Sequence, residues 1–167
     1  MPPRDGQRAG FDPLVFRDVI GHFATGVTII TTHDGQGQLF GLTANAVCSV
    51  SLEPPLVLVC VDKSAESYPA LNASGDFTIN LLGESQEALS RRFAKSGGDK
   101  FAGIGYRIGD NGAAILDDVI AHLACVARHR FDAGDHTIFV GEVHQLAVSS
   151  EDNPLLFFRG GYRNLSA

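Results

Sequence analysis

The sequence lacks the features that mark membrane proteins, secreted proteins and nucleic-acid binders. No run of about 18 apolar residues occurs, so no membrane span is expected, and Met1 to Gly10 has no apolar core of the kind found in a signal peptide. Thirteen basic residues stand against nineteen acidic ones, which gives a net charge of -6. Binding to DNA phosphates needs a cationic surface. We therefore expect no nucleic-acid partner.

Cysteine is scarce, and no metal-binding pattern is present. The three cysteines, Cys48, Cys60 and Cys125, are widely spaced and each lies in an apolar run. This pattern predicts buried free thiols in a reducing compartment, hence a cytoplasmic protein. There is no Cys-x-x-Cys pair and no His-Glu-x-x-His, so no metal site is predicted.

The common catalytic and phosphate-binding motifs are missing as well. The chain has no Gly-x-Gly-x-x-Gly fingerprint after a strand, no Walker loop and no Gly-x-Ser-x-Gly elbow. Nothing resembles the paired carboxylates of a glycosidase. A site without an evident acid, base or nucleophile suits a bound cofactor that carries the chemistry itself.

What is present is mostly β-structure. Residues 1–11 are expected to form a flexible tail and residues 12–167 one domain. Helices are predicted from Pro13 to Gly26, from a cap at Ser64 to Ala73, and from Glu84 to Lys95. Strands are predicted over 27–32, 39–51, 56–61 (buried on both faces), 76–82, 120–131, 137–148 and 154–158. Many long strands and few helices indicate a mainly β barrel with peripheral helices.

The stretch from Gly41 to Leu52 has an unusual polar face. Alternate residues of a strand point to opposite sides. The even positions from Leu42 to Leu52 are apolar or small, so we expect them to face the core. The odd positions carry Thr43, Asn45, Ser49 and Ser51, with no charge among them. An ordinary solvated face collects Lys, Glu or Arg. Short polar groups indicate a polar ligand close to the strand, although local bonding to a turn would account for them equally well.

A series of motifs in a fixed order resembles the short-chain flavin reductases, an FMN-binding split-barrel family. The series covers roughly residues 12–165. It comprises Phe23–Thr32, Gly41–Asn45, Ser49–Leu56, Phe93-Ala94, Asp99–Phe101, Gly134–His136, Gly141–Val143, Pro154–Leu156 and Gly161-Tyr162. Many relatives continue Asn-Ser-Phe where this chain has Asn45-Ala46-Val47.

The resemblance implies a homodimeric split β-barrel that reduces FMN or FAD with NADH or NADPH and supplies reduced flavin to a flavin-dependent monooxygenase. By position it implies the following flavin contacts: Val27, Thr28, Ile29, Ile30, Thr31, Thr43, Ala44, Asn45, Ser49, Val50, Ser51, Cys60, Val61, Asp62, Lys63, Ser64, Phe93, Lys100 and Phe101. Lys63 and Ser64 would lie near the ribityl phosphate. His136, Tyr162 and Arg163 would meet the nicotinamide donor, with His136 as the catalytic candidate.

Three alternatives remain open from the sequence. An FMN-binding electron carrier or sensor would keep the flavin and lack a dinucleotide site. A dimerisation module would keep the barrel and lack the flavin. An enzyme like pyridoxine-phosphate oxidase shares the barrel, but the Gly134–His136 and Ser51–Pro55 motifs favour the reductases.

Overall fold

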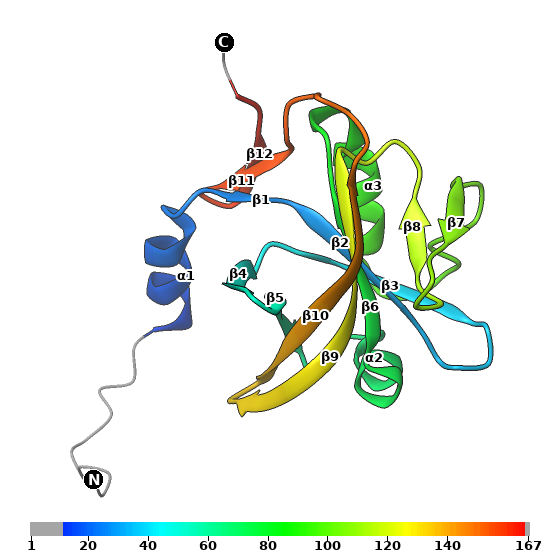
Figure 1. Ribbon diagram of the computed structural model, residues 1–167. Helices are drawn as coiled ribbons and strands as arrows, with labels where there is room; N and C mark the ends of the chain where they lie inside the picture. Colours follow the sequence, from blue (N-terminus) through cyan, green and yellow to red (C-terminus); the bar gives the residue numbers. More distant parts are fainter. Residues whose placement is uncertain (1–11, 166–167) are drawn as a thin grey trace, which may run out of the picture.

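The computed structural model describes residues 12–165 as a mainly β protein with peripheral helices, as predicted (Figure 1). The expected tail, residues 1–11, lies outside this range. The strands are β1 Thr25–Gly26, β2 Thr28–His33, β3 Leu39–Ala44, β4 Val47–Leu52, β5 Pro55–Asp62, β6 Asp76–Leu81, β7 Tyr106–Ile108, β8 Ala114–Leu116, β9 Ala121–Ala133, β10 His136–Val148, β11 Leu156–Phe158 and β12 Gly161–Arg163. The helices are α1 Pro13–Gly21, α2 Tyr68–Ser74, the short 3₁₀ helix η1 Glu84–Gln86, and α3 Glu87–Phe93.

The main sheet has seven antiparallel strands in the order β3-β2-β6-β9-β10-β5-β4. Two smaller sheets, β1-β11-β12 and β7-β8, flank it. Strand β2 is covered on both faces, because Ile30 packs in one core cluster with Phe77 and Phe139, and Ile29 packs in a second cluster with Phe93 and Leu155. The long strands β9 and β10 match the two alternating runs expected at these positions.

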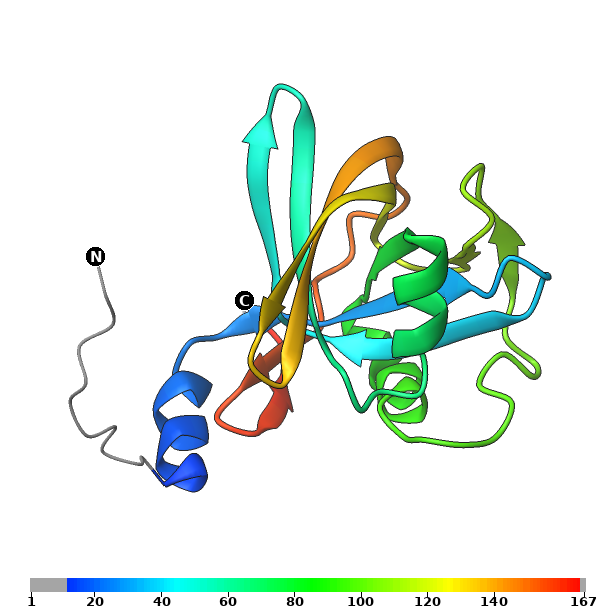
Figure 2. The same cartoon turned by 90° about the horizontal axis from the view of Figure 1, so that it is seen from below.

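The predicted strand over 39–51 is wrong, because the chain breaks at Asn45-Ala46. Its two halves, β3 and β4, lie at opposite edges of the seven-stranded sheet. The apolar even positions were expected to face the core, yet Val50 and Leu52 are exposed, and the side chain of Leu52 is 95% accessible. The reason is that the β4–β5 hairpin projects away from the barrel, as Figure 2 shows.

Four further details differ from the sequence expectations. Strand β5 is buried on one face, through Val57, Val59 and Val61, and not on both. Helix α2 begins at Tyr68 with Ser67 as its N-cap residue, so Ser64 lies in the preceding turn and caps no helix. Helix α1 ends at Gly21, before β1. Of the cysteines, Cys125 is buried, Cys60 is half-buried and Cys48 is exposed.

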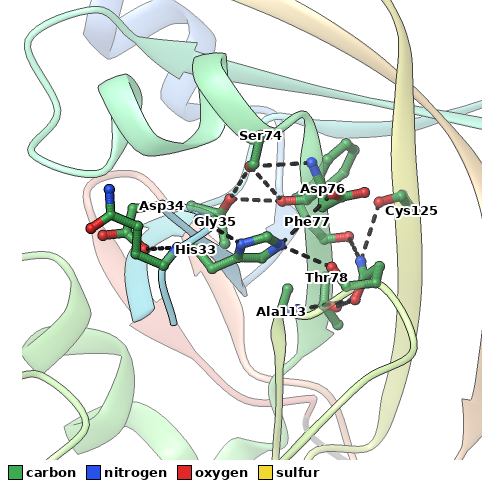
Figure 3. A network of polar contacts seen from close by, with 12 residues as sticks. His33, Asp34, Gly35, Ser74, Asp76, Phe77, Thr78, Ala113 and Cys125 are labelled. Atoms are coloured by element: carbon green, nitrogen blue, oxygen red, sulfur yellow. Dashed lines mark hydrogen bonds and ion pairs between the residues drawn. The ribbon is translucent and has the colours of Figure 1, made fainter. Parts of the chain in front are cut away.

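A polar network fastens the loop before β8 to the sheet (Figure 3). The Nε2 atom of His33 lies 3.0 Å from the carbonyl of Asn111 and 3.7 Å from a carboxylate oxygen of Asp76. The Asn111 amide donates to the carbonyls of Phe77 and Cys125, at 2.9 and 3.2 Å. The network is therefore structural, since each partner joins the loop to β2, β6 or β9.

Across residues 12–165, no helix has the length and apolarity needed to cross a bilayer.

Candidate functional site

A groove follows the edge strand β3 and consists of three adjoining hollows. The proximal hollow, about 330 Å³, is lined by Thr43, Ala44 and Asn45 together with Tyr162 of β12. The middle hollow, about 240 Å³, shares Thr43 and continues to the turn after β5 and to α3. The distal hollow, about 530 Å³, continues past Gly41 and Phe40 toward the β2–β3 hairpin. Thus the uncharged polar stretch at the end of β3 does lie beside open space.

Helix α3 holds β3 in place from one side. The Thr43 hydroxyl donates to the carbonyl of Ser90 at 2.6 Å, and the Ser90 hydroxyl lies 2.8 Å from the Tyr162 hydroxyl. A Cβ atom at Gly41 would lie only 2.6 Å from Cε1 of Phe93. Glycine is therefore required where the Phe93 ring packs under the strand. Because Thr43 already donates to Ser90, its hydroxyl can offer a ligand only acceptor capacity.

The turn after β5 forms the far wall of the middle hollow. The carboxylate of Asp62 accepts from both the backbone N–H and the hydroxyl of Ser64, each at 2.7 Å. These bonds from Ser64, backbone first, lower the pKa of Asp62. Asp62 pairs with His136 across the β5–β10 ladder. The sheet register thus places His136, the predicted nicotinamide contact, opposite Asp62, whose carboxylate is bonded to Ser64.

Two polar groups lie at the border between the middle and distal hollows. Lys100 was predicted from the sequence as a flavin contact, and Ser67 was not. Lys100, whose side chain is 12% accessible, donates to the carbonyls of Gly41 and Phe93 at 3.1 and 3.4 Å. Ser67 is 2% accessible, and its hydroxyl has no hydrogen-bond partner among the described residues. Ser67 lines both hollows. Burying a hydroxyl without a hydrogen-bond partner costs free energy of folding. A ligand oxygen that accepted a hydrogen bond from Ser67 would remove this cost.

Two charged candidates lie in or against the β9–β10 hairpin: His136 begins β10, and Lys63 follows β5 and contacts the hairpin. Nδ1 of His136 is 2.7 Å from the carboxylate of Asp135, and that hydrogen bond lowers the pKa of Asp135. Lys63 donates to the carboxylate of Asp132 and, at 2.7 Å, to the carbonyl of Gly134. The bond to Asp132 raises the pKa of Lys63. Lys63 is therefore bound to the hairpin in this structure, and contact with a phosphate would require it to leave Asp132.

Several predicted flavin contacts lie away from the groove within one chain. The side chains of Ile29, Ile30, Thr31 and Val61 are fully buried in the core. Thr28 is buried too, and its hydroxyl donates to the carbonyl of Ala44 at 2.7 Å. These side chains pack in the core beneath the groove and line none of its hollows, so the structure does not support direct contact between them and a flavin.

Other predicted residues lie near a second opening or outside the groove. Ser49, Val50 and Ser51 belong to β4, at the opposite edge of the main sheet from β3. Cys60 lines a further hollow of about 620 Å³ between α1 and the β4–β5 hairpin, which Asn45 also borders. Arg163 is exposed and donates to the carbonyl of Tyr162 at 2.7 Å. Val27, Phe93, Lys100, Phe101 and Tyr162 do line the groove.

No pattern in the sequence indicates the importance of Ser67 or Ser90. Both look like ordinary helix serines, and their roles depend on which groups the fold brings beside them. Arg91 also lines the proximal hollow, and its guanidinium lies 4.7 Å from the centre of the Tyr162 ring. Within residues 12–165 there is no group of three or more residues suited to hold a metal ion.

Comparison with known proteins agrees with this architecture. A model of the flavin reductase like domain matches residues 20–166. The chain is 42% identical over 160 residues to a flavin reductase of Pseudomonas putida, covering 96% of this chain and 94% of that protein. It is 43% identical over 154 residues to HsaB, the reductase subunit of a flavin-dependent monooxygenase of Rhodococcus jostii, covering 92% and 78%.

Solved structures show the same fold. The NADH:FAD oxidoreductase of Streptomyces globisporus, crystallised with NAD and FAD fragments, superimposes with a TM-score of 0.88 at 37% identity, covering 93% of each chain. Component B of nitrilotriacetate monooxygenase from Mycobacterium thermoresistibile gives a TM-score of 0.87 at 44% identity, covering 92% of this chain and 86% of that one. Together with the β3 groove and the order of the strands, these matches show that the chain belongs to the flavin reductase family.

Proposed function

We propose that this chain binds FMN or FAD in the groove along β3, reduces it with NADH or NADPH, and supplies the reduced flavin to a monooxygenase. The observation that carries the proposal is the groove itself, because its proximal hollow presents the short uncharged groups of Thr43, Ala44 and Asn45 and its middle hollow holds the buried, partnerless hydroxyl of Ser67. The names of the relatives point the same way. HsaB is a reductase subunit of a monooxygenase, and the Streptomyces enzyme is an NADH:FAD oxidoreductase.

The residues of the groove fit a flavin. The proximal hollow offers backbone and amide groups at Thr43, Ala44 and Asn45 to a ring edge, with apolar surface from Val27 and Phe157 beside them. The middle hollow offers the partnerless hydroxyl of Ser67 to a ribityl chain or its phosphate, whereas the Ser64 hydroxyl already donates to Asp62 and offers acceptor capacity. The partnerless hydroxyl of Ser67 is the clearest sign that this hollow is built for a polar ligand.

The protein's contribution to the reaction is position. The flavin, when bound, supplies the redox chemistry by accepting a hydride equivalent from the nicotinamide ring. The chain must hold the two rings together, and we assign this role to Tyr162, which lines the proximal hollow, and to His136, which lines none of the three hollows and is assigned from its sequence motif. His136 is oriented by its contact with Asp135, and either protonation state of its imidazole can hydrogen-bond an amide or a phosphate. Bringing two reactants into one site can remove about 7–11 kcal/mol from a barrier.

We also propose that the active form is a homodimer. Helix α1 carries Leu14, Phe16 and Val19 exposed, and the β4–β5 hairpin carries Val50 and Leu52 exposed. The hollow between these two elements is apolar and borders Asn45. A soluble monomer rarely leaves so much connected apolar surface in water. A second copy covering this face would bury β4 and would bring Ser49 and Ser51 close to a flavin.

An electron carrier of the same fold remains the second candidate function. It would bind flavin and fail to oxidise NADH. The replacement His136→Ala separates the two, because a reductase should show a raised KM for the nicotinamide donor while its Kd for flavin stays the same.

The experiment that tests the proposal is steady-state oxidation of NADH and NADPH by the purified protein with and without added FMN or FAD. A flavin-dependent rate with either donor is the expected result. If no combination of donor and flavin gives a rate above the uncatalysed one, the proposed reaction is wrong.

A further inference from the structure

The loop before β8 contains Asn111-Gly112, the one Asn-Gly dipeptide in the sequence. Such a dipeptide is chemically labile, because the backbone nitrogen of a residue without a side chain can reach the amide carbon of the preceding asparagine. The attack releases ammonia and closes a succinimide ring, and water then opens the ring to give aspartate or isoaspartate. This reaction needs no enzyme, no oxidant and no reductant.

The fold requires both residues of this dipeptide. Gly112 has a φ of +77°, a left-handed conformation that favours glycine, and a Cβ atom there would lie 2.8 Å from Nε2 of His33. The Asn111 amide is the donor that joins the loop to the carbonyls of Phe77 and Cys125. The labile pair is therefore built into the attachment of the loop, because a substitution of either residue would disturb that attachment.

The groups that would react are held apart by hydrogen bonds in this structure. The backbone N–H of Gly112 donates to the carbonyl of Gly109 at 2.9 Å, so its nitrogen is not free to attack. The side-chain oxygen of Asn111 accepts from the backbone N–H of Ala113 at 3.2 Å, which closes an Asx turn. Deamidation of Asn111 therefore requires the loop to open first.

His33 closes the loop from the side of the β2–β3 hairpin. Its Nδ1 accepts from the backbone N–H of Gly35 at 2.9 Å (Figure 3), and its Nε2 lies 3.0 Å from the carbonyl of Asn111. Because Nδ1 accepts, the ring is neutral with its proton on Nε2, which donates to Asn111. The side chain of His33 is 16% accessible. His33 thus ties the labile pair to β2.

We propose that Asn111 is a spontaneous deamidation site whose rate is set by opening of the link to His33. After conversion, a carboxylate faces the carbonyls of Phe77 and Cys125, to which the amide donated, so the loop cannot reattach. Strand β8 follows the loop and pairs with β7, which carries Tyr106 on the wall of the distal hollow. The modification therefore releases one wall of the groove permanently in molecules whose loop has opened.

The test follows the mass of one tryptic peptide while the native protein is incubated at mildly alkaline pH. Cleavage after Arg107 and Arg128 gives the peptide 108–128, in which Asn111 is the one amide side chain. The gain in mass on conversion of amide to acid therefore reports Asn111 alone. The same incubation in urea gives the conversion rate of the unfolded chain.

Two replacements at His33 separate its bond from its bulk. His33→Ala removes the link, whereas His33→Gln keeps an amide that can donate to the carbonyl of Asn111. Tyr68→Phe is the matched control, since it removes a hydrogen bond of 2.9 Å, to the hydroxyl of Thr137, in which no residue of the loop takes part. Circular dichroism confirms that each variant is folded before incubation.

The proposal predicts slow conversion of Asn111 in the native protein and fast conversion in urea. His33→Ala should convert about tenfold faster than the unmodified protein, while His33→Gln and Tyr68→Phe stay within about threefold of it, because one hydrogen bond of the closed loop is lost only in the first. Native conversion as fast as that in urea, no conversion in urea, or equal rates in His33→Ala and Tyr68→Phe would each overturn the proposal.

A second measurement uses the unmodified protein, so it does not depend on the folding of His33→Ala. Hydrogen exchange of the Gly112 amide gives the fraction of molecules in which the loop is open. The ratio of the native conversion rate to the rate in urea should equal that fraction. A ratio far above or far below the open fraction would show that opening of this loop does not set the rate.

Discussion

Three polar groups in and beside the groove have different surroundings: Thr43 to Asn45 face open space, Ser67 is buried without a partner, and Lys63 is bonded to Asp132. The polar run at Thr43 to Asn45 carries its signal in residue type alone, and it lines the groove. Ser67 has no such signal, because its significance is that the fold buries its hydroxyl without a partner. Lys63 shows the converse. Its sequence position suggested a phosphate contact, but the fold places Asp132 beside it.

Ser67→Ala should raise the stability of the flavin-free protein and weaken flavin binding. Removing a buried hydroxyl that lacks a partner should increase the free energy of unfolding by about 1 kcal/mol, and Ser67 makes no side-chain cap bond that would be lost. The Kd for flavin should rise about tenfold, equivalent to about 1.4 kcal/mol. Denaturant unfolding and fluorescence titration measure the two effects.

Ser74→Ala is the control, because Ser74 lies at the other end of α2 and its hydroxyl is bonded to Thr32 and to the backbone of Asp76. That variant should lose stability and keep its flavin affinity. If Ser67→Ala is destabilised to the same degree, then the Ser67 hydroxyl has a hydrogen-bond partner in the folded protein. That result would contradict the claim that this hydroxyl is free to bind a ligand.

Cys125 should resist alkylation in the folded protein. Burial raises the pKa of its thiol to about 12, so the reactive thiolate is scarce at about pH 8. Brief treatment with iodoacetamide followed by peptide mass spectrometry should find Cys125 modified only after denaturation. Rapid modification of Cys125 in the native protein would contradict its placement in the core.

Strands with a clear alternation of apolar and polar residues were predictable from the sequence. A break between two strands was not predictable where the alternation continues across it. Strands β9 and β10 alternate over 13 residues each, so their positions follow from the sequence. The separation of β3 from β4 does not, because the apolar even positions continue through Asn45-Ala46 without a shift. Burial against a core and burial against another chain produce the same alternation. The sequence pattern alone therefore does not distinguish a hairpin that packs on its own core from one, such as β4–β5, that projects and could pack on another chain.

The contact between α3 and β3 can be tested at Gly41. In Gly41→Ala the new Cβ would meet the Phe93 ring, so α3 must shift, which should cost about 1–3 kcal/mol of stability. The same shift should move Ser90 relative to Thr43 and weaken flavin binding. Gly26→Ala is the matched control, since a Cβ at Gly26 meets nothing within 4 Å. Urea unfolding of both variants decides it, and equal stability would show that Phe93 does not pack against Gly41.

The molecule as a whole exposes a face that a second copy would cover. Leu52→Asp should convert the proposed homodimer to a monomer, because a carboxylate buried in an apolar interface without a partner is strongly unfavourable. Light scattering coupled to size-exclusion chromatography gives the mass directly. Ile108→Asp, a change of the same kind on the exposed strand β7, should leave the mass unaltered. A wild-type protein that is already monomeric at working concentration would contradict the dimer.

The central claim is that the groove along β3 holds a flavin where a nicotinamide dinucleotide can reduce it. Anaerobic rapid mixing of the protein and FAD with NADH tests this most directly, because the oxidised flavin band bleaches only when the hydride is transferred. The account predicts bleaching at a rate that rises with NADH concentration and saturates, and that falls in His136→Ala. Bleaching no faster than in a solution of FAD and NADH without protein would contradict it.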